Sequence, residues 1–319
     1  MCQDCEGCKY LFKMVRLNEF SQLKSIEGPV DLAIGFFDGV HLGHQAVINN
    51  AIGVDENPTA VLTFDPHPLS VISSAQSPII ITPFKHKQRL IESLGVDYLL
   101  VIKFDEDRAN QSAEKFVEEI ADSCQLRSIS VGNEFRFGCD RKGDIGLLIE
   151  LGKTFGFEVN GIERVCDENG EIVSSTRVRG ALKGGDLKLA KNLLGRDFSI
   201  SGTVSKGDSI GREMSFPTAN IDLCSDLAIP YGVYAVLAEL NGDAFQGVAN
   251  LGVRPTVMGS NNSKLRLEVH LFNFNDTIYG DELNVSFLNY LREERKFDSV
   301  EDLKAQIESD VCEAKELFA

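Results

Sequence analysis

Between residues 30 and 183, short apolar runs alternate with segments of helical periodicity. Strands that alternate with helices favour a parallel sheet with right-handed crossovers, and its ligands bind at the carboxyl ends of the strands. The expected strands are Val30–Ile34, Ala60–Phe64, Tyr98–Lys103, Ser128–Gly132 and Phe157–Ile162. The expected helices are His44–Ile52, Lys85–Leu94, Ala113–Ser123 and Asp144–Phe155, the third with Phe116, Val117 and Ile120 on one side.

From Gly184 onward the pattern changes to a small antiparallel β-barrel with a last helix over Ser299–Phe318. A short helix, Asp186–Leu194, is expected to begin at Asp186 and end at Gly195. The pair Asn241-Gly242 between two β-type runs indicates a hairpin. The expected strands are Phe198–Ser205, Gly232–Glu239, Phe245–Leu251, Leu265–Phe272 and Glu282–Leu291.

The length of 319 residues is typical of two domains. We expect a Cys-containing extension over residues 1–13, a first domain over 14–183, a linker helix over 184–197 and a second domain over 198–319. Hydrophobic residues make up 43% and charged residues 25%, as in globular proteins. Neither a membrane-spanning apolar run nor a signal peptide is evident, so the sequence predicts a cytoplasmic protein. Its oligomeric state stays open.

The net charge of −16 argues against general nucleic-acid binding, because no basic tail or half is present. An anionic small substrate is still compatible with this charge. The protein would then need helix N-termini, local cations or Mg²⁺ to hold the substrate.

The eight cysteines divide into two groups. Five are scattered, which favours buried free thiols in a reducing cytosol: Cys124, Cys139, Cys166, Cys224 and Cys312. The other three, Cys2, Cys5 and Cys8, have a spacing that occurs in metal sites, but a fourth nearby ligand is missing. A frayed extension is the preferred interpretation, with a metal site as the alternative.

The segment from Gly35 to His44 reads Gly-Phe-Phe-Asp-Gly-Val-His-Leu-Gly-His. It follows an expected strand and opens an expected helix. Its glycines allow a tight turn and close approach of the backbone to phosphate, and the helix start supplies unpaired N–H groups. His41 and His44 can donate hydrogen bonds to phosphate oxygens, although two surface histidines on a turn are the plainer alternative.

This segment resembles the ATP-binding motif of the HxGH nucleotidylyltransferases. Seven further stretches resemble, in the same order, those of the bacterial bifunctional riboflavin kinase/FAD synthetase family. They are Thr63–Pro68, Val131–Gly138, Ser174–Arg179, Phe216–Asn220, Gly252–Thr256, Leu267–His270 and Leu291–Phe297.

The resemblance implies a Rossmann-like nucleotidyltransferase domain followed by a riboflavin kinase β-barrel. It implies two reactions: riboflavin and ATP give FMN, and FMN and ATP give FAD and pyrophosphate. Riboflavin, FMN, FAD and ATP would be the small-molecule partners, with Mg²⁺ as cofactor. A chain with only the kinase activity and a flavin- or nucleotide-binding regulatory protein are the alternatives.

For adenylyl transfer, the resemblance assigns roles to the first domain. Catalytic roles would fall to His41, His44 and Arg179, and Arg179 would stabilise the departing pyrophosphate. Binding of ATP phosphates would involve Gly35, Phe37, Asp38, Gly39, His41, Gly43, His44, Ser175, Thr176 and Arg179. Flavin binding would involve Asn133, Glu134, Phe135, Arg136 and Phe137. An ordinary helix cap is the alternative for the Ser174–Arg179 stretch.

For the kinase, the resemblance makes Glu268 the general base. Thr218 and Asn220 would bind Mg²⁺ and ATP phosphate, and they share one face if they lie on a strand. Arg292 would contact flavin or nucleotide, with a salt bridge to Glu293 or Glu294 as the alternative.

Some positions allow two interpretations or depart from the family pattern. Asp65 and His67 suit a structural loop as well as a ligand site. His86 and the acidic run Asp105–Asp107 are expected on the solvated surface. Glu134 stands where the family usually has Asp or Asn, and Phe36 replaces a common Asn. The longer Glu134 side chain puts FMN contact, and hence adenylylation, in question.

Overall fold

The computed structural model describes residues 13–53, 57–72, 79–207, 216–223, 227–254 and 264–319. Cys2, Cys5, Cys8 and Cys224 therefore lie outside the described residues. The chain forms two compact units. The first contains residues up to Phe37, Gly43–Pro78 and Gln88–Val165, and the second contains Asp38–Leu42, Ile79–Lys87 and Cys166–Ala319. The domain limits predicted from the sequence remain a prediction.

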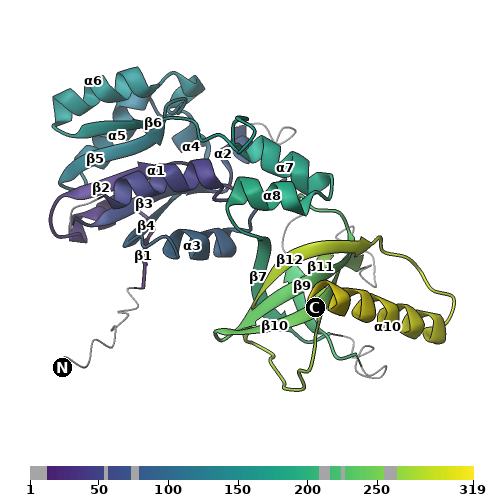
Figure 1. The fold of residues 1–319 in the computed structure, drawn as a ribbon. Helices are drawn as coiled ribbons and strands as arrows, with labels where there is room; N and C mark the ends of the chain where they lie inside the picture. The colour runs from purple at the N-terminus through teal and green to yellow at the C-terminus, as the bar shows by residue number, and fades with distance from the viewer. Residues whose placement is uncertain (1–12, 54–56, 73–78, 208–215, 224–226, 255–263) are drawn as a thin grey trace, which may run out of the picture. The chain divides into compact units, whose positions relative to one another are not determined.

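A six-stranded sheet forms the centre of the first unit (Figure 1). Its strand order is β1-β4-β3-β2-β5-β6, and every pair is parallel. The strand order reverses between β2 and β5. The loops that follow these two strands therefore lie at the switch point of the sheet, where folds of this kind bind ligands. The strands are β1 (Val15–Leu17), β2 (Val30–Ile34), β3 (Thr59–Asp65), β4 (Tyr98–Lys103), β5 (Leu126–Gly132) and β6 (Glu158–Ile162).

Helices accompany these strands. They are α1 (Leu42–Ile52), α2 (Pro68–Ile72), α3 (Phe84–Glu92), α4 (Glu106–Ala109), α5 (Ala113–Ala121) and α6 (Ile145–Phe155), with short 3₁₀ turns at Phe20–Ser25 and Cys139–Arg141. Phe116, Val117 and Ile120 of α5 are buried together against the sheet, as their spacing predicted. All five residues of β2 are buried, as expected for a central strand covered on both faces.

The second unit contains a closed antiparallel barrel with the order β10-β11-β8-β7-β12-β9. Asn241 and Gly242 both have positive φ, 53° and 92°, which is the geometry of a tight hairpin turn between β9 and β10. The expectation of a parallel α/β sheet followed by a barrel is thus confirmed. The strands are β7 (Phe198–Ser205), β8 (Ala219–Leu223), β9 (Gly232–Leu240), β10 (Asp243–Arg254), β11 (Lys264–Leu271) and β12 (Glu282–Arg292).

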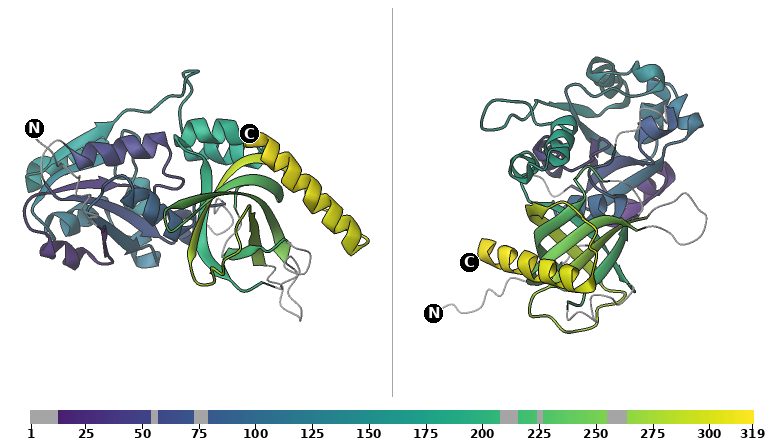
Figure 2. Two further views of the ribbon diagram at one scale, coloured as in Figure 1. Left: turned by 60° about the horizontal axis from the view of Figure 1, so that its bottom comes forward. Right: turned by 90° about the vertical axis from the view of Figure 1, so that its right-hand side faces the viewer.

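Among its described residues, this unit contains α7 (Ser175–Lys183), α8 (Leu187–Leu194), α10 (Val300–Leu317) and the start of α3. Helix α8 begins after Asp186, its N-cap, and ends at Gly195 at φ 71°, as predicted, and Ser299 caps α10. The yellow helix α10 runs along the outside of the barrel (Figure 2). Its buried Ala314 packs with Val233 and Ala235 of β9.

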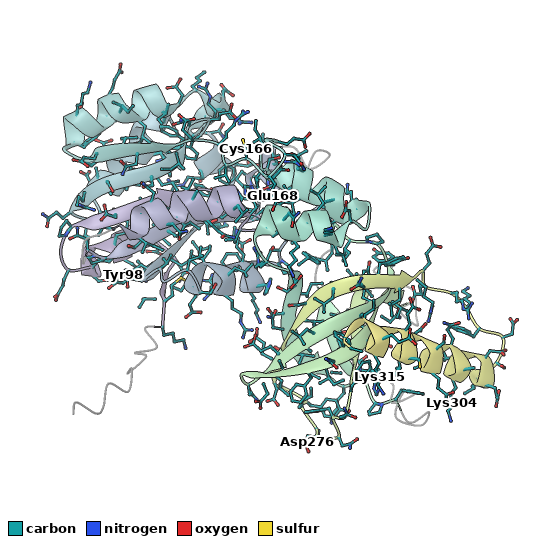
Figure 3. All side chains as sticks on the ribbon, viewed as in Figure 1. Tyr98, Cys166, Glu168, Asp276, Lys304 and Lys315 are labelled. Atoms are coloured by element: carbon teal, nitrogen blue, oxygen red, sulfur yellow. The ribbon has the colours of Figure 1, made fainter. Side chains whose placement is uncertain are left out.

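Two surface expectations are wrong. His86 is only 3% exposed, because its ring nitrogens hydrogen-bond the hydroxyls of Ser199 and Ser201 on β7. Of the scattered cysteines, Cys124 and Cys139 are half-buried, but Cys166 and Cys312 are exposed. Figure 3 labels Cys166 in the loop ahead of α7. The acidic run is at the surface as expected, with Asp105 accepting from Arg108 N as the cap of α4.

The described part of the chain contains no helix long and apolar enough to cross a membrane. Within the same residues, no group of three or more His, Cys, Asp or Glu side chains could hold a metal ion.

Candidate active sites

Asp38 anchors the turn that the sequence analysis assigned to ATP phosphates. The side chain is 2% exposed and accepts hydrogen bonds from Ile81 N at 3.0 Å and Thr82 N at 3.1 Å. Its second carboxylate oxygen accepts from Arg179 Nη2 at 2.7 Å. Because its oxygens are occupied by protein donors, Asp38 shapes the turn and orients Arg179, whereas the backbone N–H groups of the turn remain suited to anions.

Arg179 and Ser175 converge on this turn from α7. Arg179 Nε donates to Ile79 O at 2.8 Å, and Ser175 Oγ donates to Asp38 O at 3.1 Å. The Arg179 side chain is only 16% exposed, so its guanidinium is held in one orientation beside the turn. Thr176, which follows Ser175, is exposed.

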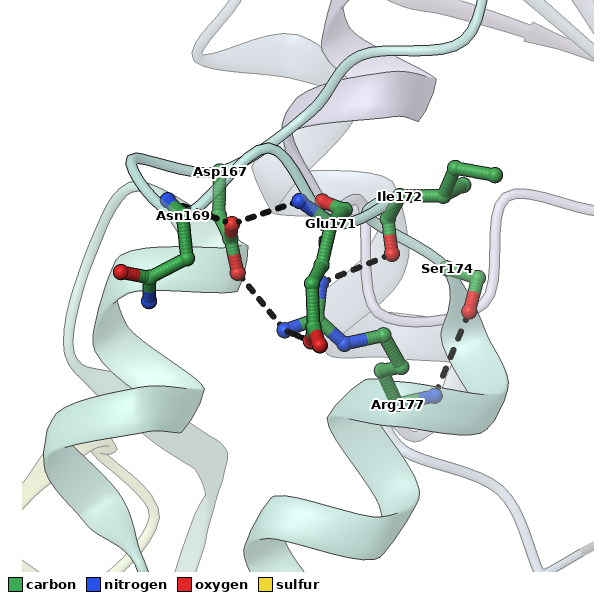
Figure 4. Close-up of polar contacts among 6 residues, drawn as sticks. All are labelled: Asp167, Asn169, Glu171, Ile172, Ser174 and Arg177. Carbon is green, nitrogen blue, oxygen red and sulfur yellow. Dashed lines mark hydrogen bonds and ion pairs between the residues drawn. The ribbon is translucent and has the colours of Figure 1, made fainter.

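Ser174 is the N-cap of α7, since its hydroxyl accepts from Arg177 N at 3.3 Å. Arg177 was not assigned a role from the sequence, and it orders the preceding loop (Figure 4). Its guanidinium donates to Glu171 O, Ile172 O and Asp167 Oδ2. Arg177 also holds the pKa of Asp167 below its usual value. Ser174 is therefore an ordinary helix cap, the alternative considered for this stretch. Ser175, Arg177 and Arg179 make the other hydrogen bonds described here.

The two histidines of the motif are in different environments. His41 is 5% exposed, and burial lowers its pKa to about 4, with smaller contributions from the Arg179 and Arg196 guanidinium groups. It is therefore neutral at pH 7 and can act as a hydrogen-bond donor without a charge. His44, in the first turn of α1, contacts the Phe37 ring edge-on at 5.4 Å between centroids.

Gly35 lies close to the ring of Phe37. A Cβ on Gly35 would lie 2.8 Å from the ring of buried Phe37, so any side chain there would require this ring to move. Phe36, the departure from the family pattern, contacts the ring of His67 at 4.0 Å between centroids. The Phe36 carbonyl accepts from Thr63 Oγ1. His67 Nδ1 in turn accepts from Leu69 N at 3.0 Å, which supports the structural interpretation of this loop.

An apolar cavity of about 750 Å³ opens beside the expected flavin loop within the first unit. Phe135 and Phe137 stack at 5.4 Å with an angle of 14° and line it together with Arg136. An aromatic-lined cavity of this size can accommodate a planar heteroaromatic ligand. Sequence reasoning missed several of its other lining residues, among them Phe64, Pro68, Leu69, Ile72 and Phe104.

Asn133 and Glu134 do not line this cavity. Asn133 Nδ2 donates to Glu163 Oε1 at 2.7 Å, and Glu134 forms an ion pair with Arg164. Arg164 is also the main reason that the pKa of Glu134 is lowered. The extra methylene of Glu134 therefore extends toward Arg164 in this structure.

Three polar residues lie side by side on the barrel. Glu268 of β11 pairs in register with Asn220 of β8 on one side and with Asn250 of β10 on the other. Asn220 is 5% exposed and its Nδ2 donates to Thr218 O at 3.2 Å. Asn250 Nδ2 donates to Glu294 Oε1 at 3.3 Å. Asn250 and Glu294 were not assigned to the site: the place of Asn250 beside Glu268 follows only from strand register, and Glu294 is joined to it only through Asn250.

Thr218 lines a cavity of about 460 Å³ within the second unit, formed by the start of β8 and the segment 274–279. The backbone around Gly207 packs directly on Asn220, because a Cβ there would lie 2.3 Å from Asn220 Nδ2. The Thr218 hydroxyl and the Asn220 amide supply oxygen ligands of the kind that Mg²⁺ prefers.

Arg292 makes a salt bridge, but with neither of the partners considered from the sequence. Its Nη2 lies 2.7 Å and its Nε 2.9 Å from the carboxylate of Asp310 on α10, which is 3% exposed. Arg292 Nη1 donates to the backbone carbonyl of Glu293. Arg292 thereby fastens α10 to the end of β12.

Comparisons with known proteins match both units. Residues 23–177 match a family described as FAD synthetase, and residues 194–318 match one described as riboflavin kinase. The bifunctional riboflavin kinase/FMN adenylyltransferase of Buchnera aphidicola is 40% identical, covering 93% of this chain and 96% of the relative. The proteins of the same name from Escherichia coli and Bacillus subtilis are 39% and 38% identical over 96% and 90% of this chain.

Among solved structures, one described as a macrolide-efflux protein from Streptococcus pneumoniae is similar throughout. It is 31% identical with a TM-score of 0.73, over 93% of this chain and 97% of that one. Both halves of the chain thus match in the order in which their motifs occur, at an identity and coverage that establish kinship. The chain belongs to the family of bifunctional riboflavin kinase/FMN adenylyltransferases.

Proposed function

We propose that this chain phosphorylates riboflavin with ATP to give FMN and ADP, and then transfers AMP from a second ATP to FMN, giving FAD and pyrophosphate. The observation that carries the proposal is that one chain contains both family matches. The first match includes His41 and His44, and the second includes Thr218, Asn220 and Glu268. ATP is the co-substrate of both steps, and riboflavin, FMN and FAD are substrates or products.

Adenylyl transfer proceeds by attack of an FMN phosphate oxygen on the α-phosphorus of ATP, with the bond to pyrophosphate breaking. Catalysis then consists of positioning and charge stabilisation. Arg179 suits the departing pyrophosphate, because its fork binds phosphate oxygens and is oriented by Asp38. Neutral His41 donates a hydrogen bond to ATP phosphate, as does His44. The aromatic cavity at Phe135 and Phe137 accommodates the isoalloxazine ring.

Phosphorylation of riboflavin requires a base, since a neutral hydroxyl is a weak nucleophile. Glu268 takes the proton of the ribityl hydroxyl as that oxygen attacks the γ-phosphorus and ADP leaves. Its neighbours in register are amides, so no carboxylate lies directly opposite it on either adjacent strand.

Mg²⁺ fits the donor set at the kinase site. Thr218 Oγ1 and the amide oxygen of Asn220 would hold it together with phosphate oxygens of ATP. When bound, the ion neutralises the β- and γ-phosphate charge. The donation by Asn220 Nδ2 to Thr218 O fixes the amide, which leaves its oxygen as the ligand atom.

We place the reactions in the cytoplasm, where riboflavin and ATP are available, and assign no nucleic-acid or membrane partner to the chain. The test is incubation with riboflavin and Mg-ATP followed by chromatography of the flavins. Appearance of FMN and then FAD supports both activities. FMN alone would reduce the proposal to a kinase, and binding of flavin without turnover would indicate a regulatory protein.

A further inference from the structure

Arg196 has no role in the sequence analysis, yet it makes a set of contacts at the ATP-binding turn. It follows Gly195, which ends α8 in a left-handed conformation. Its Nη2 donates to Gly39 O at 2.7 Å, and its Nη1 donates to Val40 O at 3.0 Å. Nη1 also lies 3.3 Å from Leu194 O. One guanidinium therefore joins two successive carbonyls of the turn to the end of α8.

The Gly39–Val40 turn needs external support. Gly39 has φ 85° and Val40 has φ 42°. A positive φ is unfavourable for a β-branched residue and persists only where the surroundings hold it. Val40 is 1% exposed, so solvent does not compensate its backbone groups. The two hydrogen bonds from a cation are the strong, charge-assisted type that can hold such a conformation.

The guanidinium is buried at a cost. Burial lowers the pKa of Arg196 to about 10, which still leaves it charged at pH 7. Its Nε is buried and has no hydrogen-bond partner among the residues that the structure describes. An unsatisfied buried donor is unfavourable, so the contacts with the turn must outweigh it. The turn leads directly into His41 and the first residue of α1, Leu42.

We propose that Arg196 is a positioning residue of adenylyl transfer: it holds the Gly39–Val40 turn, and through it His41, in the conformation that receives ATP. This inference rests on the proposed role of the His41 turn in ATP binding. Arg196 itself donates to backbone carbonyls and contacts no reacting atom.

The experiment uses the full chain with Arg196→Met, Arg196→Lys, His41→Ala and, as a matched control, Arg127→Met. Arg127 pairs with buried Asp31 near the start of β5, at the sheet edge opposite the carboxyl ends of the strands. Loss of Arg127 therefore tests destabilisation without a change at the turn. For each variant, kcat and KM for ATP are measured for FAD formation from FMN and for FMN formation from riboflavin.

We expect Arg196→Met to raise the KM for ATP in FAD formation about 10-fold or more, the usual effect of losing hydrogen bonds from a charged group. FMN formation should stay within about twofold of the wild type, because the hydrogen bonds of Arg196 in the described part of the chain go to Gly39, Val40 and Leu194. Arg196→Lys should recover part of the ATP affinity, since an ammonium can donate to one of the two carbonyls. Arg127→Met should lower the melting temperature and leave the KM for ATP unchanged.

An unchanged KM for ATP in Arg196→Met would overturn the proposal, as would equal losses in both reactions. If the methionine variant does not fold, Arg196→Lys decides: an intermediate KM supports the proposal, and a wild-type KM overturns it. His41→Ala separates the two levels of the argument. If His41→Ala loses FAD formation while the Arg196 variants behave like the wild type, the proposed function stands and the positioning role of Arg196 is refuted. If His41→Ala keeps full FAD formation, the ATP-binding role of the turn itself is refuted.

Discussion

At the scale of single residues, the charged groups of both candidate sites are held by other protein groups. Arg179 is oriented by Asp38, and Arg292 is paired with Asp310. Preorganised charges lose little further freedom when a substrate binds, which is the general basis of electrostatic catalysis. We therefore expect substitution of Arg179 to affect FAD formation, and loss of the Arg292–Asp310 pair to affect the attachment of α10.

Replacing Arg179 with Ala should impair FAD formation and let FMN accumulate. Removal of a guanidinium that stabilises transferring phosphoryl charge costs roughly 10²–10³ in kcat. Asp38 would also lose its ion partner while it remains buried, so a loss of stability of about 3 kcal/mol is expected as well. Flavin products are separated by chromatography with circular dichroism as the folding control. Equal loss of both activities in a folded variant would contradict the assignment of Arg179 to adenylylation.

Glu268→Gln should have the reverse effect. The amide keeps the size of the side chain and cannot accept the proton of the hydroxyl, so FMN formation should fall about 10²–10⁴-fold. FAD formation from supplied FMN should persist. Initial rates with riboflavin and with FMN distinguish the two steps, and near-normal phosphorylation of riboflavin would exclude Glu268 as the base.

His41 should make the protein less stable in mild acid. In the unfolded chain it takes up a proton near its ordinary pKa of 6.5, whereas the folded chain resists protonation down to a pKa of about 4. The unfolded state thus binds more protons in this window, and the free energy of unfolding falls as the pH drops from 6.5 to 4. Urea unfolding of the wild type should lose up to about 1.4 kcal/mol per pH unit more than His41→Asn. Parallel pH profiles would contradict the buried neutral state.

The roles of these residues could be inferred from motifs, but their partners could not. Asp310 lies 18 residues after Arg292, and only the packing of α10 brings the two together. His86 looks like a surface residue by its polar neighbours in the sequence, and the two serines that bury it lie more than 110 residues away. Partners of this kind depend on tertiary structure, which local pattern does not contain.

At the scale of secondary structure, the long periodic elements were predicted well, and the short ones were missed. Strand β2 has the predicted limits, because four of its five residues are apolar. By contrast, β1 has three residues and α2 has five, too few for a period to emerge. The missed helix α2 lines the aromatic cavity, so part of the candidate flavin site was missed with it.

Helix α10 should depend on Asp310 for its attachment to the barrel. Asp310→Ala leaves Arg292 without its carboxylate in a half-buried position, and breaking a pair of this kind costs about 3 kcal/mol. The double variant Arg292→Ala/Asp310→Ala should recover part of this loss, because no unpaired charge then remains. The readout is the urea midpoint of each variant. Additive losses in the double variant would show that the two side chains are not energetically coupled.

At the scale of the whole molecule, two reactions share one chain, and the change in sequence pattern near Gly184 suggests that they can be separated. The described structure adds a constraint to that expectation. Residues 79–87 pack with the second unit, where His86 is buried between Ser199 and Ser201 of β7. A fragment that starts at Gly184 loses this segment, so the serines become exposed on the barrel surface.

We nevertheless expect residues 184–319 to fold and to phosphorylate riboflavin without making FAD. The closed barrel keeps its own hydrogen-bonded strands, and serine hydroxyls can be solvated in place of His86. Its melting temperature should be lower than that of the barrel in the full chain. Residues 14–197 should adenylylate FMN, because this fragment retains Arg196, whereas a fragment that ends at Gly195 should bind ATP more weakly. Kinase activity of the purified C-terminal fragment is the deciding measurement, and a folded fragment without FMN formation would mean that the kinase site requires residues before Gly184.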